Sequence, residues 1–263
     1  MNLVFPVASE YTADDIKKVQ RELLRMAKIV TKILEENDIP YFIAFGTLIG
    51  AIKFKGFLPW DDDIDLFLFD DSYAKAIALL EEKLPEHLIV HSEKNDPNYF
   101  LAWNNVVNIN TTVEYAEIYH PDNRLLGYKC LGVGLYRLKK MKRSEIPRYK
   151  KDEAIKFFKR KYNKKIIDKA TYKSEVAKIN KNNVLFGVKS DADDDIFYFV
   201  VKVKKPISIK DVYPLKKIDF EDTQFFAPND PLAVLECSFE NLGELPPYEE
   251  RRPHLKNVKF IKE

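Results

Sequence analysis

The clearest amphipathic pattern lies near the N-terminus, where apolar residues recur at three- and four-residue steps, as on one face of an α-helix. Thr12 and Asp15 fit a capping box, in which a hydroxyl and a carboxylate satisfy the free amides of a helix start. The pattern predicts a helix from Thr12 to about Asn37 with its apolar stripe in the core. The residues of this stripe are Ile16, Val19, Leu23, Met26, Val30, Ile33 and Leu34.

Shorter apolar runs follow this helix. Residues 41–45, YFIAF, are aromatic and β-branched, which is typical of a buried strand. Residues 46–56, GTLIGAIKFKG, predict a glycine turn and a helix directly after it. Residues 61–69, DDDIDLFLF, predict a second strand with carboxylates at its entrance, and a short helix is expected from about Ser72 to Leu84.

The pattern changes in the second half of the chain. Residues 86–136 predict mostly strands and loops, whereas 137–182 predict helices with one inward stripe, formed by Ile155, Phe158, Tyr162 and Ile166. VLFGV and IFYFVVKV flank a polar stretch and predict a hairpin with aspartates at its tip. We expect three parts: a core (1–136), a basic helical segment (137–183) and a C-terminal part packed on the core (184–263).

Composition narrows the classes of protein. With 263 residues and a net charge of +2, nothing favours a nucleic-acid binder. Cys130 and Cys237 lack CxxC spacing, which excludes a disulfide scaffold and a recognisable zinc site. No signal peptide or membrane span is predicted, so a cytoplasmic protein is expected.

Charge is distributed unevenly along the chain. Residues 137–182 carry a net charge of +13 and the remainder −11. This asymmetry favours a basic face in peripheral contact with an anionic membrane surface or another polyanion, and the plainer alternative is a solvated pair of helices.

The stretch most informative for function is DDDID. Because strand side chains alternate, Asp61, Asp63 and Asp65 should share one face, with Asp62 and Ile64 on the other. Three carboxylates on one face repel one another and are pushed toward protonation unless a cation lies between them. A hard cation such as magnesium prefers these oxygens and also holds a diphosphate. The stretch therefore predicts a metal site, against the alternative of an acidic turn.

Neighbouring residues are candidates for substrate binding. Gly46 and Gly50 would let backbone amides approach an anionic group at a helix N-terminus. Lys53 and Lys55 add positive charge, although surface lysines are usually only solvated. Trp60, beside the aspartates, is more often a packing residue than a ligand contact.

Two longer motifs stand out in the chain. They are IPYFIAFGTLIGAIKFKGFLPWDDDIDLFLF at residues 39–69, and VYPLKKIDFEDTQFFAPNDPLAVLE with LPPYEERRPH near the C-terminus. The first resembles the long motif of the LicD family of phosphocholine transferases, which is related to fukutin, and the second is similar to that family's C-terminal pattern. The motif RRPH favours His254 as a residue that faces the site, whereas the other histidines, His87, His91 and His120, lack ligand spacing.

The resemblance implies an α+β fold with a nucleotidyltransferase-like core, a mixed sheet flanked by helices. It implies transfer of a phosphoalcohol, phosphocholine as the first guess, from a CDP-linked donor to a glycan or glycolipid hydroxyl, assisted by magnesium or manganese. Gly46 and Thr47 would belong to the nucleotide-facing turn and Asp63 and Asp65 to the metal, with Asp61 completing the metal shell or taking the acceptor's proton. A choline cation would have four candidate aromatic neighbours: Trp60, Trp103, Tyr41 and Tyr99.

The sequence departs from the family pattern in three places. Tyr136 stands where many relatives carry an aspartate. Because the ordinary pKa of a tyrosine hydroxyl is about 10, this group is no ordinary magnesium ligand at neutral pH. Asn105 and Val107 stand where relatives often show basic residues, and LECSFENLGELPP lacks the usual tyrosine-glycine-aspartate stretch. Either a second metal is lost or another carboxylate replaces the ligand: Glu114, Glu117 or Asp61.

Two alternatives remain open at this point. One is a nucleotidyltransferase that uses the same metal site and releases pyrophosphate. The other is a catalytically inactive module that binds an anionic glycan, a membrane surface or nucleic acid through the basic segment.

Overall fold

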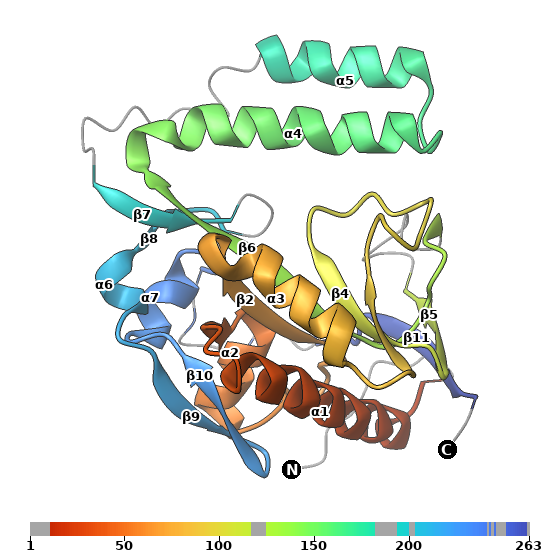
Figure 1. The fold of residues 1–263 in the computed structure, drawn as a ribbon, viewed down its shortest axis with the longest axis vertical. Helices are drawn as coiled ribbons and strands as arrows, with labels where there is room; N and C mark the ends of the chain where they lie inside the picture. The colour runs from red at the N-terminus through yellow and green to blue at the C-terminus, as the bar shows by residue number, and fades with distance from the viewer. Residues whose placement is uncertain are drawn as a thin grey trace.

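The computed structural model describes residues 11–116, 125–181, 194–199, 203–240, 242, 245 and 251–261. A curled seven-stranded mixed sheet flanked by helices forms its centre (Figure 1). The strand order is β1-β2-β6-β4-β3, and β7 and β8 extend the sheet from the far half of β6. The strands of this sheet are β1 (Tyr41–Ile43), β2 (Ile64–Phe69), β3 (Leu88–His91), β4 (Asn104–Asn108), β6 (Gly132–Lys142), β7 (Asp195–Tyr198) and β8 (Ile207–Ser208). Among the strand pairs that the structure describes in this sheet, β2 and β6 are parallel and the others are antiparallel. The α+β class is confirmed.

Helix α1 (Ala13–Glu35) confirms the N-terminal pattern. The Asp15 amide donates to the Thr12 hydroxyl at 3.2 Å, and the Thr12 amide donates to the Asp15 carboxylate at 3.0 Å, which completes the capping box. The apolar stripe is buried, and α1 packs beside α3 (Asp70–Lys83) against the sheet. This helix therefore supplies core and scaffold.

Strand β2 is buried on both faces because its side chains alternate between two cores. Leu66 and Leu68 pack in the core that α1 covers, whereas Phe67 and Phe69 pack in a second, aromatic core. Asp65 has the same parity as these phenylalanines and lies on the aromatic side.

The connection from β1 to α2 (Phe45–Phe54) differs from the expected glycine turn. The helix begins directly after the strand, and both Gly46 and Gly50 lie inside it. Phe45 makes the sharp change of direction itself, with a positive φ of 46°. Its ring is held by aromatic neighbours, Phe67 at 5.0 Å and Tyr136 at 5.4 Å between ring centroids. Packing thus maintains a backbone conformation that a bulky residue rarely adopts.

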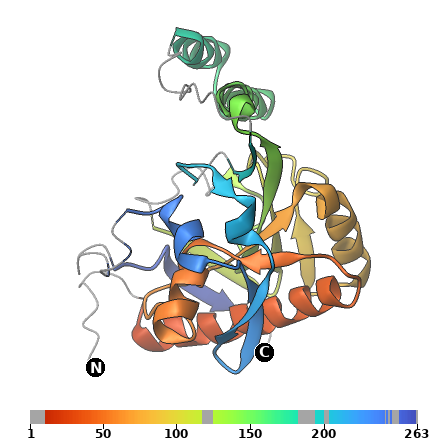
Figure 2. The same cartoon turned by 90° about the vertical axis from the view of Figure 1, so that its left-hand side faces the viewer.

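The basic segment forms two helices that stand off the body. β6 continues through the expected boundary at residue 136 and ends at Lys142, followed by a 3-10 turn, η2 (Arg143–Glu145). Helices α4 (Ile146–Asn163) and α5 (Lys169–Lys181) then run antiparallel to each other, and both views place them apart from the sheet (Figures 1 and 2). We call residues 146–181 the helical arm.

The C-terminal part returns to the body in short elements. These are α6 (Ile209–Val212), the hairpin of β9 (Lys216–Phe220) and β10 (Thr223–Ala227), α7 (Pro231–Glu236) and β11 (Leu255–Phe260), which pairs with β5 (Thr111–Tyr115). The first strand and most of the tip of the hairpin expected around KSDADDD lie outside the described residues. Among the helices described, none has the length and apolar character needed to cross a membrane.

Candidate functional site

The acidic stretch lies mostly in the loop between α2 and β2. Because β2 begins at Ile64, residues Asp61, Asp62 and Asp63 precede the strand, and the expected alternation of their side chains is wrong. Gln20 of α1 holds the loop, since its side-chain amide donates to the Asp61 carbonyl at 2.9 Å. Loop contacts therefore determine where each carboxylate points.

Asp61 is buried with one oxygen that lacks a partner. Its side chain is 6% exposed, and Oδ2 has no hydrogen-bond partner among the described residues. This oxygen lies against Gly46, 2.7 Å from the position that a Cβ atom would take there. Any larger residue at position 46 would collide with the carboxylate. A buried acceptor without a partner is costly, and a bound cation would satisfy it.

Asp62 anchors the C-terminal segment to this loop. Its carboxylate is buried and accepts hydrogen bonds from the His254 amide at 2.9 Å and the Leu255 amide at 2.8 Å. The His254 ring lies at hydrogen-bond distance as well, with Nδ1 at 3.1 Å from Oδ1. Asp62 therefore joins two segments that are 192 residues apart in the chain.

His254 lies among the three acids of the loop. Its Nδ1 is 3.4 Å from the Asp63 carboxylate, in addition to the contact with Asp62. One ligand atom from each of Asp61, Asp62 and His254 lies within 4.8 Å of the others, so these three residues form a candidate metal-binding cluster. In the sequence alone, only the RRPH motif points to His254, and strand alternation places Asp62 on the opposite face. We call Asp61, Asp62, Asp63 and His254 the acidic cluster.

Asp65 lies at the start of β2, next to the residue that departs from the family pattern. Its amide donates to the Thr47 hydroxyl at 3.0 Å, which ties α2 to the strand. On β6, a Cβ atom at Gly134 would lie 2.7 Å from the Asp65 carboxylate and 2.6 Å from the Tyr136 ring. The glycine thus leaves room for the Tyr136 ring to fold back, and the tyrosine hydrogen-bonds to Asp65.

The electrostatics of the acidic cluster are dominated by burial and mutual repulsion. Burial raises the pKa of Asp61 well above its usual value, Asp63 raises it further, and His254 opposes both. Burial also raises the pKa of Asp62 against the hydrogen bonds from His254. Burial alone would lower the pKa of His254, but the surrounding carboxylates outweigh it and raise the pKa to about 10. A protonated His254 partly balances the acids, and it would have to lose this proton to bind a metal through Nδ1.

The predicted substrate-binding residues lie around this cluster in different settings. Gly50 contacts backbone, because a Cβ atom there would be 2.3 Å from the Gly56 carbonyl oxygen. Lys53 and Lys55 are exposed on the last turn and cap of α2. Trp60 is buried, and the guanidinium of Arg251 lies 5.5 Å from its ring centroid. Arg251 lies in the RRPH stretch but was not among the predicted site residues.

The residues that depart from the family pattern supply no basic group. Asn105 donates to a tyrosine hydroxyl at 3.2 Å, and Val107 is buried in β4. Glu114, one candidate replacement ligand, is exposed and lies 3.7 Å from the Lys256 ammonium on the neighbouring strand. Glu117 lies outside the described residues. Of the two candidate ligands that the structure describes, Asp61 lies in the acidic cluster and Glu114 does not.

The candidate aromatic neighbours of a choline cation differ in how exposed their rings are. Tyr41 was a wrong prediction, because it is completely buried and its hydroxyl donates to Glu35 at 2.5 Å. Tyr99 is also buried and donates to the Trp103 carbonyl at 2.5 Å. Trp103 is half-buried, and its ring centroid lies 5.1 Å from that of Tyr136. Trp103 is therefore the more accessible of these rings on the Asp65 side.

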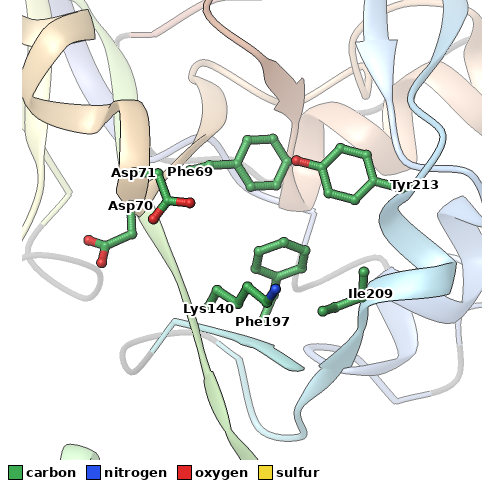
Figure 3. A pocket seen from close by; sticks show the side chains of 7 residues that line it. All are labelled: Phe69, Asp70, Asp71, Lys140, Phe197, Ile209 and Tyr213. Atoms are coloured by element: carbon green, nitrogen blue, oxygen red, sulfur yellow. The ribbon is translucent and has the colours of Figure 1, made fainter. Parts of the chain in front are cut away.

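A pocket of about 180 Å³ lies at the other end of β2 (Figure 3). Stacked and tilted aromatic rings line it on one side, with charged side chains at the rim. Two of these charged groups already have partners, since Asp70 pairs with Arg137 and Lys140 lies 3.6 Å from Asp195. The lining side chains are Phe69, Asp70, Asp71, Lys140, Phe197, Ile209 and Tyr213. None of them belongs to the acidic cluster.

Comparison with known families defines the class of domain. Residues 38–127, about a third of the chain, match the family described as LicD/FKTN/FKRP, nucleotidyltransferase domain. This match includes α2, the acidic loop and β2. This part of the chain is therefore similar to the LicD family, in agreement with the resemblance seen in the sequence.

Two individual relatives each match part of the chain. A lipopolysaccharide cholinephosphotransferase LicD from Haemophilus influenzae is 36% identical over 72 residues, 27% of each chain. An uncharacterised protein from Rickettsia prowazekii is 28% identical over 159 residues, 53% of each chain. The chain thus spans about half or less of the length of these relatives.

Proposed function

We propose that this protein transfers a phosphoalcohol group from a CDP-linked donor to a hydroxyl of a glycan or glycolipid, with the help of a divalent cation. The observation that carries the proposal is the orphaned, buried Oδ2 of Asp61 beside Gly46, within the family-matched part of the chain. The relative from Haemophilus influenzae, named as a cholinephosphotransferase, makes phosphocholine our first choice of cargo.

Magnesium or manganese suits the donor set, because carboxylate oxygens dominate it. Asp61 belongs to the metal set on account of its orphaned oxygen, and Asp63 and Asp65 belong to it by the family resemblance. When bound, the cation would neutralise charge on the donor diphosphate and on the leaving nucleotide. Asp62 would act indirectly, because its carboxylate is occupied by two backbone amides.

The chain's own groups would bind and orient the substrates. His254 and Arg251 bring positive charge to the acidic loop, where the phosphates of a donor would lie. The alternative role for Asp61, in place of holding the cation, is that of a base that accepts the proton of the acceptor hydroxyl. Trp103, half-buried beside Tyr136, is our candidate to contact a cationic cargo. No covalent protein intermediate is needed for this chemistry.

A second candidate is nucleotidyl transfer, which the description of the matched domain favours. That reaction would attack the α-phosphorus of a nucleoside triphosphate and release pyrophosphate. An inactive binding module is the third candidate, because Tyr136 stands in the position of a family aspartate and covers Asp65.

One experiment distinguishes the three candidates. The protein is incubated with magnesium and a panel of cytidine and uridine diphosphate donors or nucleoside triphosphates, with and without a lipopolysaccharide or oligosaccharide acceptor, and released nucleotides are identified by mass. We expect cytidine monophosphate from a CDP-linked donor. Pyrophosphate would instead establish the nucleotidyltransferase, and no turnover with any donor would favour the binding module.

A pair of variants ties turnover to the site. Asp63→Asn removes a charge from the acidic cluster with little change of volume and should lower the rate by about 1,000-fold, if the metal contributes several kcal/mol to the transition state. Asp71→Asn makes the same change at an exposed position at the other end of β2 and should leave the rate unchanged. Equal rates in both variants would refute the assignment of Asp63.

A further inference from the structure

The helical arm, residues 146–181, is a projecting element with little core of its own. Within it only Ile146 and Ile179 are buried. Figure 2 views the two helices nearly end-on, clear of the sheet and joined to it through the end of β6. We propose that the arm docks the protein onto the anionic surface of a lipid bilayer.

The arm carries a large excess of positive charge. Residues 146–181 contain 13 basic and 4 acidic side chains, in a chain whose total net charge is only +2. The basic residues nearer the sheet behave differently, since Lys142 lies 3.0 Å from Asp195 and Arg143 lies 2.6 Å from Asp194. The unbalanced part of the basic segment is therefore the arm itself, not its base.

The apolar side chains of the arm are used within the molecule. Tyr162 of α4 stacks on Tyr172 of α5 with ring centroids 5.1 Å apart. Phe157 of α4 contacts Phe100 of the body, at 6.3 Å between centroids. These contacts hold the two helices together and fix α4 on the body. None of the large apolar side chains of residues 146–181 is exposed, so the arm offers charge and no apolar face to a partner.

The outward charges are mostly lysines without ion partners. Lys159, Lys169 and Lys173 are exposed, and none forms an ion pair within the described part of the chain. By contrast, Lys156 and Lys178 are held by glutamates on their own helices at 2.7 and 2.6 Å. Unpaired, solvated lysines retain their charge for an external partner.

The kind of positive charge favours a bilayer over a phosphate pocket or a nucleic acid. The arm has 11 lysines and only two arginines. Arginine is the preferred residue for bidentate recognition of individual phosphates, whereas lysine acts as a compact point charge without a fixed binding geometry. The lysines are spread along two helices, of which α4 alone is about 27 Å long. A planar array of anionic head groups matches such an extended, non-stereospecific charge pattern.

Vesicle flotation with the full chain tests the proposal without any substrate. One set of vesicles contains phosphatidylcholine alone, and a second contains added phosphatidylglycerol. We expect binding to the anionic vesicles only, weakening steeply between 50 and 300 mM salt because of screening. Lys159→Glu, Lys169→Glu and Lys173→Glu combined should weaken this binding by about 100-fold, given the contribution of each basic residue near an anionic surface.

The matched control places the same charge change on the body. Lys17, Lys75 and Lys259 are exposed on α1, α3 and β11, and their combined replacement by Glu should leave vesicle binding within about threefold of the wild type. Equal losses in both triple variants would overturn the proposal, because net charge alone would explain binding. Wild-type binding to soluble RNA or heparin with no binding to anionic vesicles would overturn it in favour of another polyanion.

Discussion

Replacing Asp62 by Asn tests how firmly the C-terminal segment is held to the acidic loop. The carboxylate accepts three hydrogen bonds, from the His254 amide at 2.9 Å, the His254 ring at 3.1 Å and the Leu255 amide at 2.8 Å. Asparagine keeps one acceptor oxygen and turns an amino group toward the donors on the other side. At least one buried N–H therefore loses its partner.

The magnitude follows from the number and kind of bonds lost. A hydrogen bond to a charged group contributes about 1.5–3 kcal/mol, and an unsatisfied buried donor costs about 1–3 kcal/mol. Asparagine carries no charge, so the free-energy cost of burying the Asp62 carboxylate, which is the reason for its raised pKa, disappears. This gain offsets part of the loss. We expect a net loss of about 2–4 kcal/mol in the free energy of unfolding, or about 5–15 °C in melting temperature for a domain of this size.

Urea denaturation followed by circular dichroism at pH 7 measures this loss. Hydrogen exchange should show lower protection first in β5 and β11, because β11 begins at the residue that Asp62 holds. Asp63→Asn is the control, since Asp63 is partly exposed and its contact with His254 is 3.4 Å long. A loss below about 0.5 kcal/mol for Asp62→Asn, or an equal loss in both variants, would refute the anchoring role.

Two further predictions concern a charge and a close backbone contact. Burial lowers the pKa of His254, but the carboxylates around it, Asp63 foremost, raise it to about 10. Its contribution to stability is therefore complete below pH 6.5 and lost as the pH rises toward 10, so urea titrations across this range should show a decline that His254→Asn removes. Gly50→Ala places a Cβ atom 2.3 Å from the Gly56 carbonyl oxygen and should cost about 1–3 kcal/mol in the same assay. An unchanged urea midpoint would mean that the loop moves aside freely.

Local pattern was enough to predict the elements that carry the site. The stripe from Ile16 to Leu34 defines α1, and the apolar run ending at Phe69 defines β2, because periodicity and capping act over a few residues. The first residue of β2 could not be read in this way. Three aspartates in succession fit either the start of a strand or a loop. In the structure they form a loop, and the Gln20 side chain, distant in sequence, holds it by donating to the Asp61 carbonyl.

Long-range partners were the part that the sequence could not provide. His254 meets Asp62 across 192 residues, and no spacing within either segment encodes that contact. The glycines show the same limit. Gly46 and Gly50 were interpreted through their freedom to approach phosphate, but each lies where a side chain would strike another part of the protein, the Asp61 carboxylate or the Gly56 carbonyl. A glycine in a sequence indicates a close approach without indicating what approaches.

The pair of Gly134 and Tyr136 bears directly on the metal site that we propose. An aspartate at position 136 would add a negative charge next to Asp65, which a second cation would have to balance. The tyrosine instead donates to Asp65, and burial together with Asp65 and Asp63 raises its pKa far above the physiological range, so it stays neutral. Gly134 is required by this arrangement because the ring occupies the space of its missing side chain. On the proposed function, the exchange removes one charge from the site and places a neutral hydroxyl on Asp65, which favours one bound cation over two.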